Sequence, residues 1–69
     1  MSEGIHIKRF APDDSDGRTT WDIVISDDDK IVLVQIPCQS DAESTRIAHE
    51  LKYLLSRFTL INWNENIFN

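Results

Sequence analysis

The sequence is poor in the residues that usually stabilise or activate a very small protein. Cys38 is its only cysteine, so no disulfide can form within the chain, and a lone thiol is typical of a reducing compartment. Gly4 and Gly17 are its only glycines, which excludes the glycine-rich loops that hold phosphates and dinucleotides. A length of 69 residues allows one small domain, residues 1–69, with a small core.

Basic residues and long apolar runs are also scarce. Twelve acidic residues oppose seven basic ones, and the resulting net charge of −5 disfavours direct binding to nucleic acid or to anionic membranes. The longest purely apolar run, residues 31–34, is far shorter than the roughly 20 residues that cross a bilayer. Residues 1–6 carry neither the basic nor the apolar part of a secretory signal. We therefore expect a cytoplasmic protein that contacts neither nucleic acid nor membrane directly.

The apolar residues that are present have the spacing of a folded domain. Their share of 41% is too high for a disordered acidic tail. Alternating or continuously apolar patterns predict strands at residues 5–10, 19–26 and 31–36. The third strand is apolar on both faces except at Gln35, and we expect Pro37 to end it. Residues 27–30 are expected to form a tight hairpin between the second and third strands.

A helix is expected to follow the strands. Ser40 and Glu43 have the spacing of a capping box, which satisfies backbone donors at a helix start. A stripe of apolar residues then recurs at helical spacing and predicts one buried face: Ile47, Leu51, Leu54, Leu55 and Phe58. We predict a helix over residues 41–57. The tail, residues 58–69, is expected to be either a short fourth strand or an irregular apolar segment.

The expected fold class is α+β, a three-stranded antiparallel meander followed by one helix (β-β-β-α). The helix covers one face of the sheet, yet the third strand is apolar on both faces. Since large exposed apolar patches are rare in monomers, the second face needs cover. Either the apolar tail or a second copy of the chain would supply it.

The acidic clusters do not match a metal site. Asp14 to Gly17 resembles part of a calcium loop, but Pro12 and Ile23 stand where that template needs ligands. Three consecutive aspartates at residues 27–29 point in different directions and are ordinary turn residues. We therefore expect no metal and no cofactor.

The nucleophile and the imidazoles also lack a catalytic pattern. His6 and His49 have no second ligand or base at a suitable spacing, so both are expected to be surface residues. Cys38 precedes the expected helix start, where a thiol pKa can fall, but no glycine-rich turn surrounds it. We interpret Cys38 as an inert loop thiol and the protein as no enzyme.

Surface features remain as the basis for a function. We expect a small non-enzymatic acidic protein that inhibits or regulates a larger protein with a basic surface, such as a nucleic-acid-handling protein. By analogy alone, phage inhibitors of host defence have this profile. The expected electrostatic contacts are Asp13, Asp14, Asp16, Asp27, Asp28 and Asp29. The expected apolar contacts are Trp63, Ile67 and Phe68. The alternative is a self-association module, a homodimer formed through the open sheet face and the tail.

Overall fold

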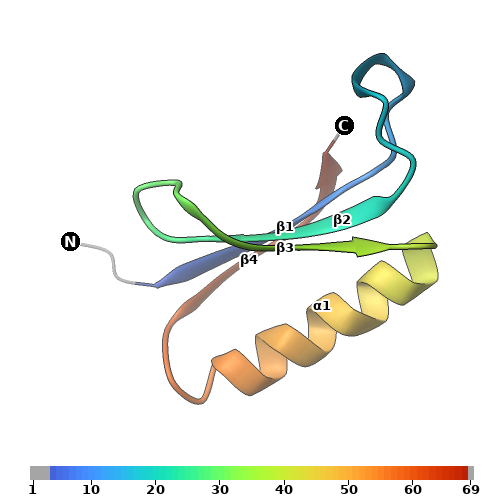
Figure 1. The fold of residues 1–69 in the computed structure, drawn as a ribbon. Coiled ribbons are helices and arrows are strands. Elements are labelled where there is room, and N and C mark those ends of the chain that lie inside the picture. Colours follow the sequence, from blue (N-terminus) through green and yellow to red (C-terminus); the bar gives the residue numbers. More distant parts are fainter. Residues whose placement is uncertain (1–3, 69) are drawn as a thin grey trace.

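One four-stranded sheet with one long helix across a single face makes up the protein (Figure 1). The computed structural model describes residues 4–68, and the side chains of residues 4–63. The elements are β1 (Ile5–Phe10), η1 (Asp14–Asp16), β2 (Trp21–Ser26), β3 (Val32–Cys38), α1 (Asp41–Leu55) and β4 (Ile61–Phe68), where η1 is a short 3₁₀ turn. The expected α+β class is confirmed. Neither helical segment within residues 4–68 has the length and apolar character needed to cross a membrane.

The sheet is mixed, and this corrects the expected antiparallel meander. Its strand order is β3-β2-β1-β4, with β1–β2 and β2–β3 antiparallel as expected. The tail forms β4, which pairs in parallel with β1. Because parallel strands need a long crossover connection, α1 carries the chain from β3 at one edge to β4 at the other. The tail therefore extends the sheet and does not lie over its open face.

Most element boundaries agree with the sequence, and the exceptions have local causes. β1 coincides with the expected strand, while β2 begins two residues later than expected, at Trp21. β3 runs through Pro37 to Cys38 instead of ending before the proline. An edge strand tolerates proline because the missing N–H would face solvent. α1 ends at Leu55, two residues early, because residues 56–58 continue in tighter turns, with the Phe58 N–H donating to the Leu55 carbonyl.

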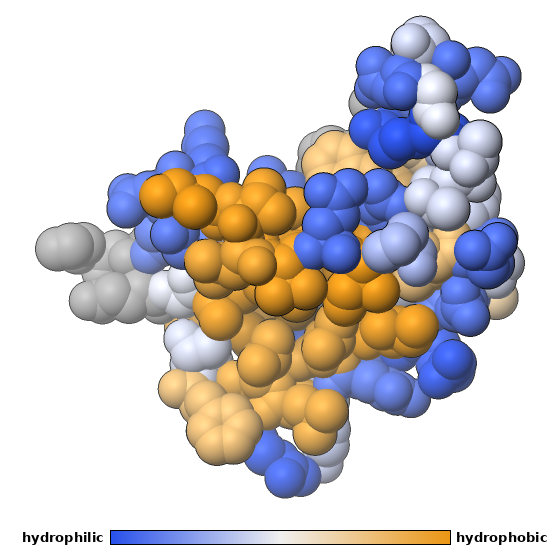
Figure 2. Space-filling view, viewed as in Figure 1, coloured by the Kyte–Doolittle hydropathy of each residue, from blue (hydrophilic) through white to orange (hydrophobic). Residues whose placement is uncertain are grey.

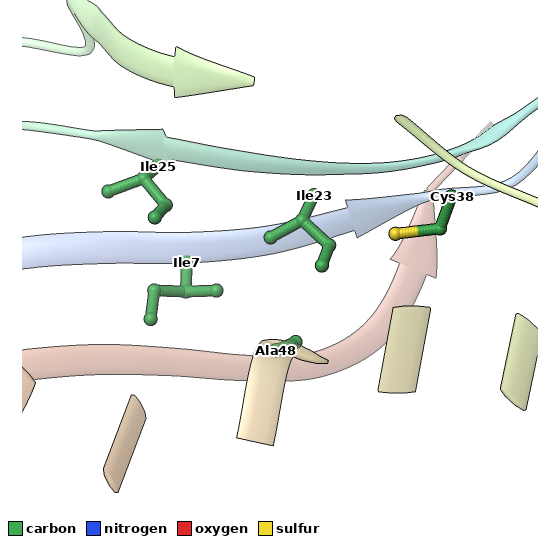
Figure 3. Packing of buried hydrophobic residues seen from close by; sticks show 5 residues of the cluster. All are labelled: Ile7, Ile23, Ile25, Cys38 and Ala48. Atoms are coloured by element: carbon green, nitrogen blue, oxygen red, sulfur yellow. The ribbon is translucent and has the colours of Figure 1, made fainter. Parts of the chain in front are cut away.

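The core lies between the sheet and α1 (Figure 3). Its buried apolar side chains among the described residues are Ile7, Ile23, Ile25, Cys38 and Ala48. Ala48 and the buried Ser44 are small, so α1 approaches the sheet closely. Since each helical residue turns by about 100°, Leu54 lies to one side of the direction set by Ser44 and Ala48. Leu54 is 50% and Phe58 83% exposed, so the expected buried stripe is wrong for these two residues.

The helix start has the expected capping interactions with one change of partner. Ser40 Oγ accepts a hydrogen bond from the Glu43 backbone N–H. The Glu43 carboxylate accepts from the backbone N–H of Gln39, one residue before the cap. These bonds satisfy donors that a helix start leaves without intrahelical partners.

One buried arginine ties the first turn of α1 to the sheet. The side chain of Arg9, in β1, is on the helix side, and the residue is only 8% exposed. Its Nη1 donates to Asp41 Oδ1 at 2.8 Å, to Thr45 Oγ1 at 2.7 Å and to Ser44 Oγ at 3.3 Å. Hydrogen bonds that involve a charged group are worth more than neutral ones. Arg9 therefore fixes where the helix begins relative to β1.

We expect Arg9→Ala to lower the free energy of unfolding by about 2 kcal/mol, because a buried charge-assisted hydrogen-bond cluster is lost. Chemical denaturation followed by circular dichroism measures the change. The control is Arg46→Ala, which removes an exposed pair with Glu50 and is expected to cost less than about 0.5 kcal/mol. Equal effects of the two substitutions would contradict the role assigned to Arg9.

The start of the β1–β4 pair requires a residue without a side chain at Gly4. The Leu60 carbonyl accepts a hydrogen bond from the Ile5 N–H at 2.9 Å. A Cβ added at Gly4 would lie 2.5 Å from that carbonyl oxygen. Backbone atoms cannot move aside as a flexible side chain does, so any larger residue separates the two strands here.

We expect Gly4→Ala to lower the free energy of unfolding by at least about 1 kcal/mol through overpacking. The same substitution should speed hydrogen exchange of the Ile5 amide. The control is Gly17→Ala, where φ is +73° but no atom lies within 4 Å of the added Cβ. It should cost about 1 kcal/mol through backbone strain. It should leave Ile5 protected, so a similar loss of protection in both variants would refute the steric explanation.

Candidate functional site

The outer edge of β3 has unusual chemistry for an exposed strand. β3 has a neighbour on one side only, β2. The large apolar residues in and just before it, Ile31, Val32, Leu33 and Val34, are 46–59% exposed. No charged residue occurs between Lys30 and Asp41. Proteins usually protect such edges with charges or a covering segment, because unpaired strand groups attract other chains.

Two local features define which part of this edge is open for pairing. The register between β2 and β3 shifts so that Ile25 faces Val34 and Ser26 faces Val32, which leaves Leu33 without a partner in β2. At the other end, Pro37 faces Asp22 and has no N–H to donate. The usable edge is therefore about five residues long, Val32 to Ile36.

The neighbouring flank of α1 extends this apolar surface. Leu54 and Phe58 are exposed, while Ile47 and Leu51 are half-buried against the core. Figure 2 shows the apolar side chains of β3 and α1 as one continuous area. We name this area the edge patch, and its members are Ile31, Val32, Leu33, Val34, Ile47, Leu51, Leu54 and Phe58.

The open face of the sheet carries both polar and apolar side chains, and the tail does not lie over it. Asp22 lies there and is nearly buried, accepting hydrogen bonds from Thr20 Oγ1 at 2.6 Å and from Gln35 Nε2 at 2.7 Å. The guanidinium of Arg18 lies 5.7 Å from the ring centroid of Phe10. The unexpected exposure is at the edge of β3 because the bulge and the edge position leave its side chains only partly covered.

Of the expected acidic contacts at residues 27–29, Asp27 holds the hairpin and Asp28 contacts β1. Asp27 Oδ1 accepts from the backbone N–H groups of Asp29 and Ile31, both at 2.9 Å. Asp28 Oδ1 lies 2.9 Å from His6 Nε2. The carboxylate of Asp29 has no partner among the described residues. Aspartates here thus have a turn-forming role that explains their presence.

The other acidic cluster also serves its own loop. Asp13 caps η1 and accepts from both the hydroxyl and the backbone N–H of Ser15, and these bonds lower the pKa of Asp13. Asp16 pairs with Arg18 at 3.5 Å. Asp14 is exposed and has no side-chain partner within the described part of the chain. This loop and the 27–29 hairpin lie at opposite ends of the sheet, so no single acidic site forms (Figure 1).

The expected apolar contacts fall in two categories. Trp63 is half-buried and packs against the core. The ring centroids of Trp63 and His49 lie 5.0 Å apart, and Lys52 Nζ lies 5.3 Å from the ring centroid of Trp63. Trp63 therefore already has contacts within the domain. The side chains of Ile67 and Phe68 lie outside the described residues.

A shallow groove lies on the other flank of α1, beside the start of β4. Its volume is about 680 Å³, and its lining residues are His49, Lys52, Tyr53, Ser56, Thr59, Leu60 and Ile61. Among the described side chains, no group of three or more His, Cys, Asp or Glu residues is arranged to hold a metal. The two histidines are separated, since His6 contacts Asp28 and His49 contacts Trp63.

Sequence patterns indicated only part of the edge patch. The two-sided apolar character of residues 31–36 predicted a surface in need of cover, and the exposed apolar residues lie at the outer edge of β3. The edge of β3 stays open because β4 pairs with β1 and not with β3, which no local pattern specifies. The uncharged run from Ile31 to Ser40 was the available signal, since charge is the usual protection of an edge.

Comparisons with known proteins add no relative to this picture. The chain matches no protein-family model, no curated protein and no solved structure. Functional inference therefore depends on the chain's own geometry, in which the edge patch is a feature that internal packing does not explain.

We expect Cys38 to react slowly with thiol reagents in the folded protein. It is 1% exposed, and burial, reinforced by Glu43 and Asp22, raises the pKa of its thiol. A raised pKa leaves less of the reactive thiolate at any given pH. Alkylation at mildly alkaline pH should therefore be much slower than in denaturant, and equal rates would contradict a buried thiol.

Proposed function

We propose that this protein is a non-enzymatic binding module that pairs its β3 edge with a strand of another polypeptide. The observation that carries the proposal is the uncharged, half-exposed apolar edge of β3. In this recognition mode, main-chain hydrogen bonds supply affinity, and side chains on alternate faces supply selectivity. The edge patch offers both, because the strand edge and the flank of α1 form one surface.

The size of the core supports a binding role. Only five apolar residues of the described chain are buried, so the folded domain gains little from internal packing. Small domains of this kind are commonly supported by association. Burial of Leu54 and Phe58 against a partner would add apolar contacts that the monomer cannot make for itself.

The acidic residues fit this proposal in a supporting role. Three of the six expected contacts, Asp13, Asp16 and Asp27, are engaged within their own loops, and Asp28 contacts His6 in β1. Net negative charge keeps a domain with an apolar patch soluble and disfavours non-specific association. A basic partner, and inhibition or regulation of it, stay predictions from the sequence.

Leu54→Lys tests the proposal against Tyr53→Lys as a matched control. The two residues are adjacent in α1 and both are exposed, at 50% and 67%, but only Leu54 belongs to the edge patch. Binding should weaken at least about tenfold for Leu54→Lys and hardly change for Tyr53→Lys. Each variant is immobilised, and the amount of polypeptide that it binds is measured. Equal recovery by both variants would refute the proposal.

A further inference from the structure

We infer that the strand added to β3 is β3 of a second copy of the chain, paired antiparallel about a twofold axis near Val34. This inference rests on the proposed function and names its partner. The result is one continuous sheet of eight strands, with both α1 helices on the same face. The interface is isologous, since the same surface of each copy takes part.

The main-chain groups at the edge are self-complementary in this register. Because Pro37 has no N–H, its position opposite Asp22 places the missing donor on the free side of β3. Alternation along the strand then directs the N–H and C=O of Gln35 to the same free side. Leu33 is the extra residue of the bulge and has no partner in β2, so its main-chain groups are not used by the ladder within this chain. With Val34 on the axis, Leu33 of each copy lies opposite Gln35 of the other copy, so this pair occurs twice.

The side chains match the same symmetry. Val34, which pairs with the core residue Ile25, meets its own counterpart on the axis on the helix side of the sheet, whereas Val32 lies near Gln35 on the open face. β-branched residues of this type pack well as cross-strand pairs. Both α1 flanks then border the new pair of strands from the same face, so Leu54 and Phe58 of each copy can fold over the junction.

The available apolar area is near what a stable dimer needs. Full burial removes roughly 60–120 Å² for one such side chain, so six that are about half exposed offer on the order of 300 Å² per copy. A standard interface buries about 800 Å² per partner, a little over half of it apolar. The half-buried Ile47 and Leu51 and the strand backbone itself supply the remainder.

Charge favours a second copy in this arrangement despite the net charge of −5. The pairing region itself is uncharged. Its register brings Lys30 opposite Cys38 of the second copy, beside the first turn of α1 with Asp41 and Glu43. The remaining long-range repulsion is between like-charged molecules and is screened by salt. Added salt should therefore preserve or strengthen the dimer, whereas it would weaken a complex with a basic protein.

Sedimentation equilibrium of the full chain at micromolar concentration, at low and high salt, tests the inference. The expected mass is twice the chain mass of 8.0 kDa at both salt concentrations. A monomer throughout would overturn the second copy as partner. If Leu54→Lys still lost binding to a different polypeptide in that case, the proposed function would stand, whereas no loss would overturn both.

A main-chain variant tests the register without changing any side chain. Chemical synthesis with ligation at Cys38 can place an N-methyl group on the Gln35 amide. The dissociation constant of the dimer should rise at least about tenfold, because two symmetry-related hydrogen bonds are lost. Circular dichroism melting confirms that the variant folds, and Tyr53→Lys serves as the unaffected control. If neither N-methylation of Gln35 nor Leu54→Lys raised the dissociation constant of the dimer above that of the unmodified chain, the inference would be overturned.

Discussion

The parallel pairing of β4 with β1 is the constraint on which the rest of the structure depends. It forces α1 to act as a crossover, because two parallel strands cannot be joined by a short turn. The crossover places the two strands that flank it, β3 and β4, at opposite edges of the sheet. β1 thereby gains neighbours on both sides, while β3 keeps one. The apolar edge that we assign to binding is thus a consequence of how the far edge is completed.

The position of α1 on the sheet explains why its apolar stripe is only partly used. Ser44 and Ala48 face the sheet and are small, and Arg9 holds the first turn through Asp41 and Thr45. Close approach at this end directs the larger side chains of the second half of the helix to its flanks. Leu55 still reaches the core, whereas Leu54 does not. One amphipathic helix therefore serves two surfaces, one internal and one on the side of β3.

The features that depend on neighbouring residues could be predicted from the sequence. Alternation identified β1, the capping box located the start of α1, and the aspartates at residues 27–29 marked the hairpin. Features set by distant residues could not be predicted. β4 forms because β1 has a free side, and Gly4 matters because Leu60 approaches it across the sheet. Pro37 would end an isolated strand but is accommodated at an edge. Sequence alone likewise does not show that Asp13 and Asp27 accept hydrogen bonds within their own turns.

Gly4 also has a consequence for the order in which the chain folds. Ile5 pairs with Ile61, so this contact closes a loop that includes almost the entire domain. Contacts between residues so far apart in the chain form slowly, because much chain entropy is lost before they are made. The β1–β2–β3 meander and α1 depend on closer contacts and should form earlier. Before β4 pairs with β1, β1 is itself an edge strand. A domain with two open edges is most prone to associate with the wrong chain. A glycine that lets the last strand dock without obstruction shortens that interval.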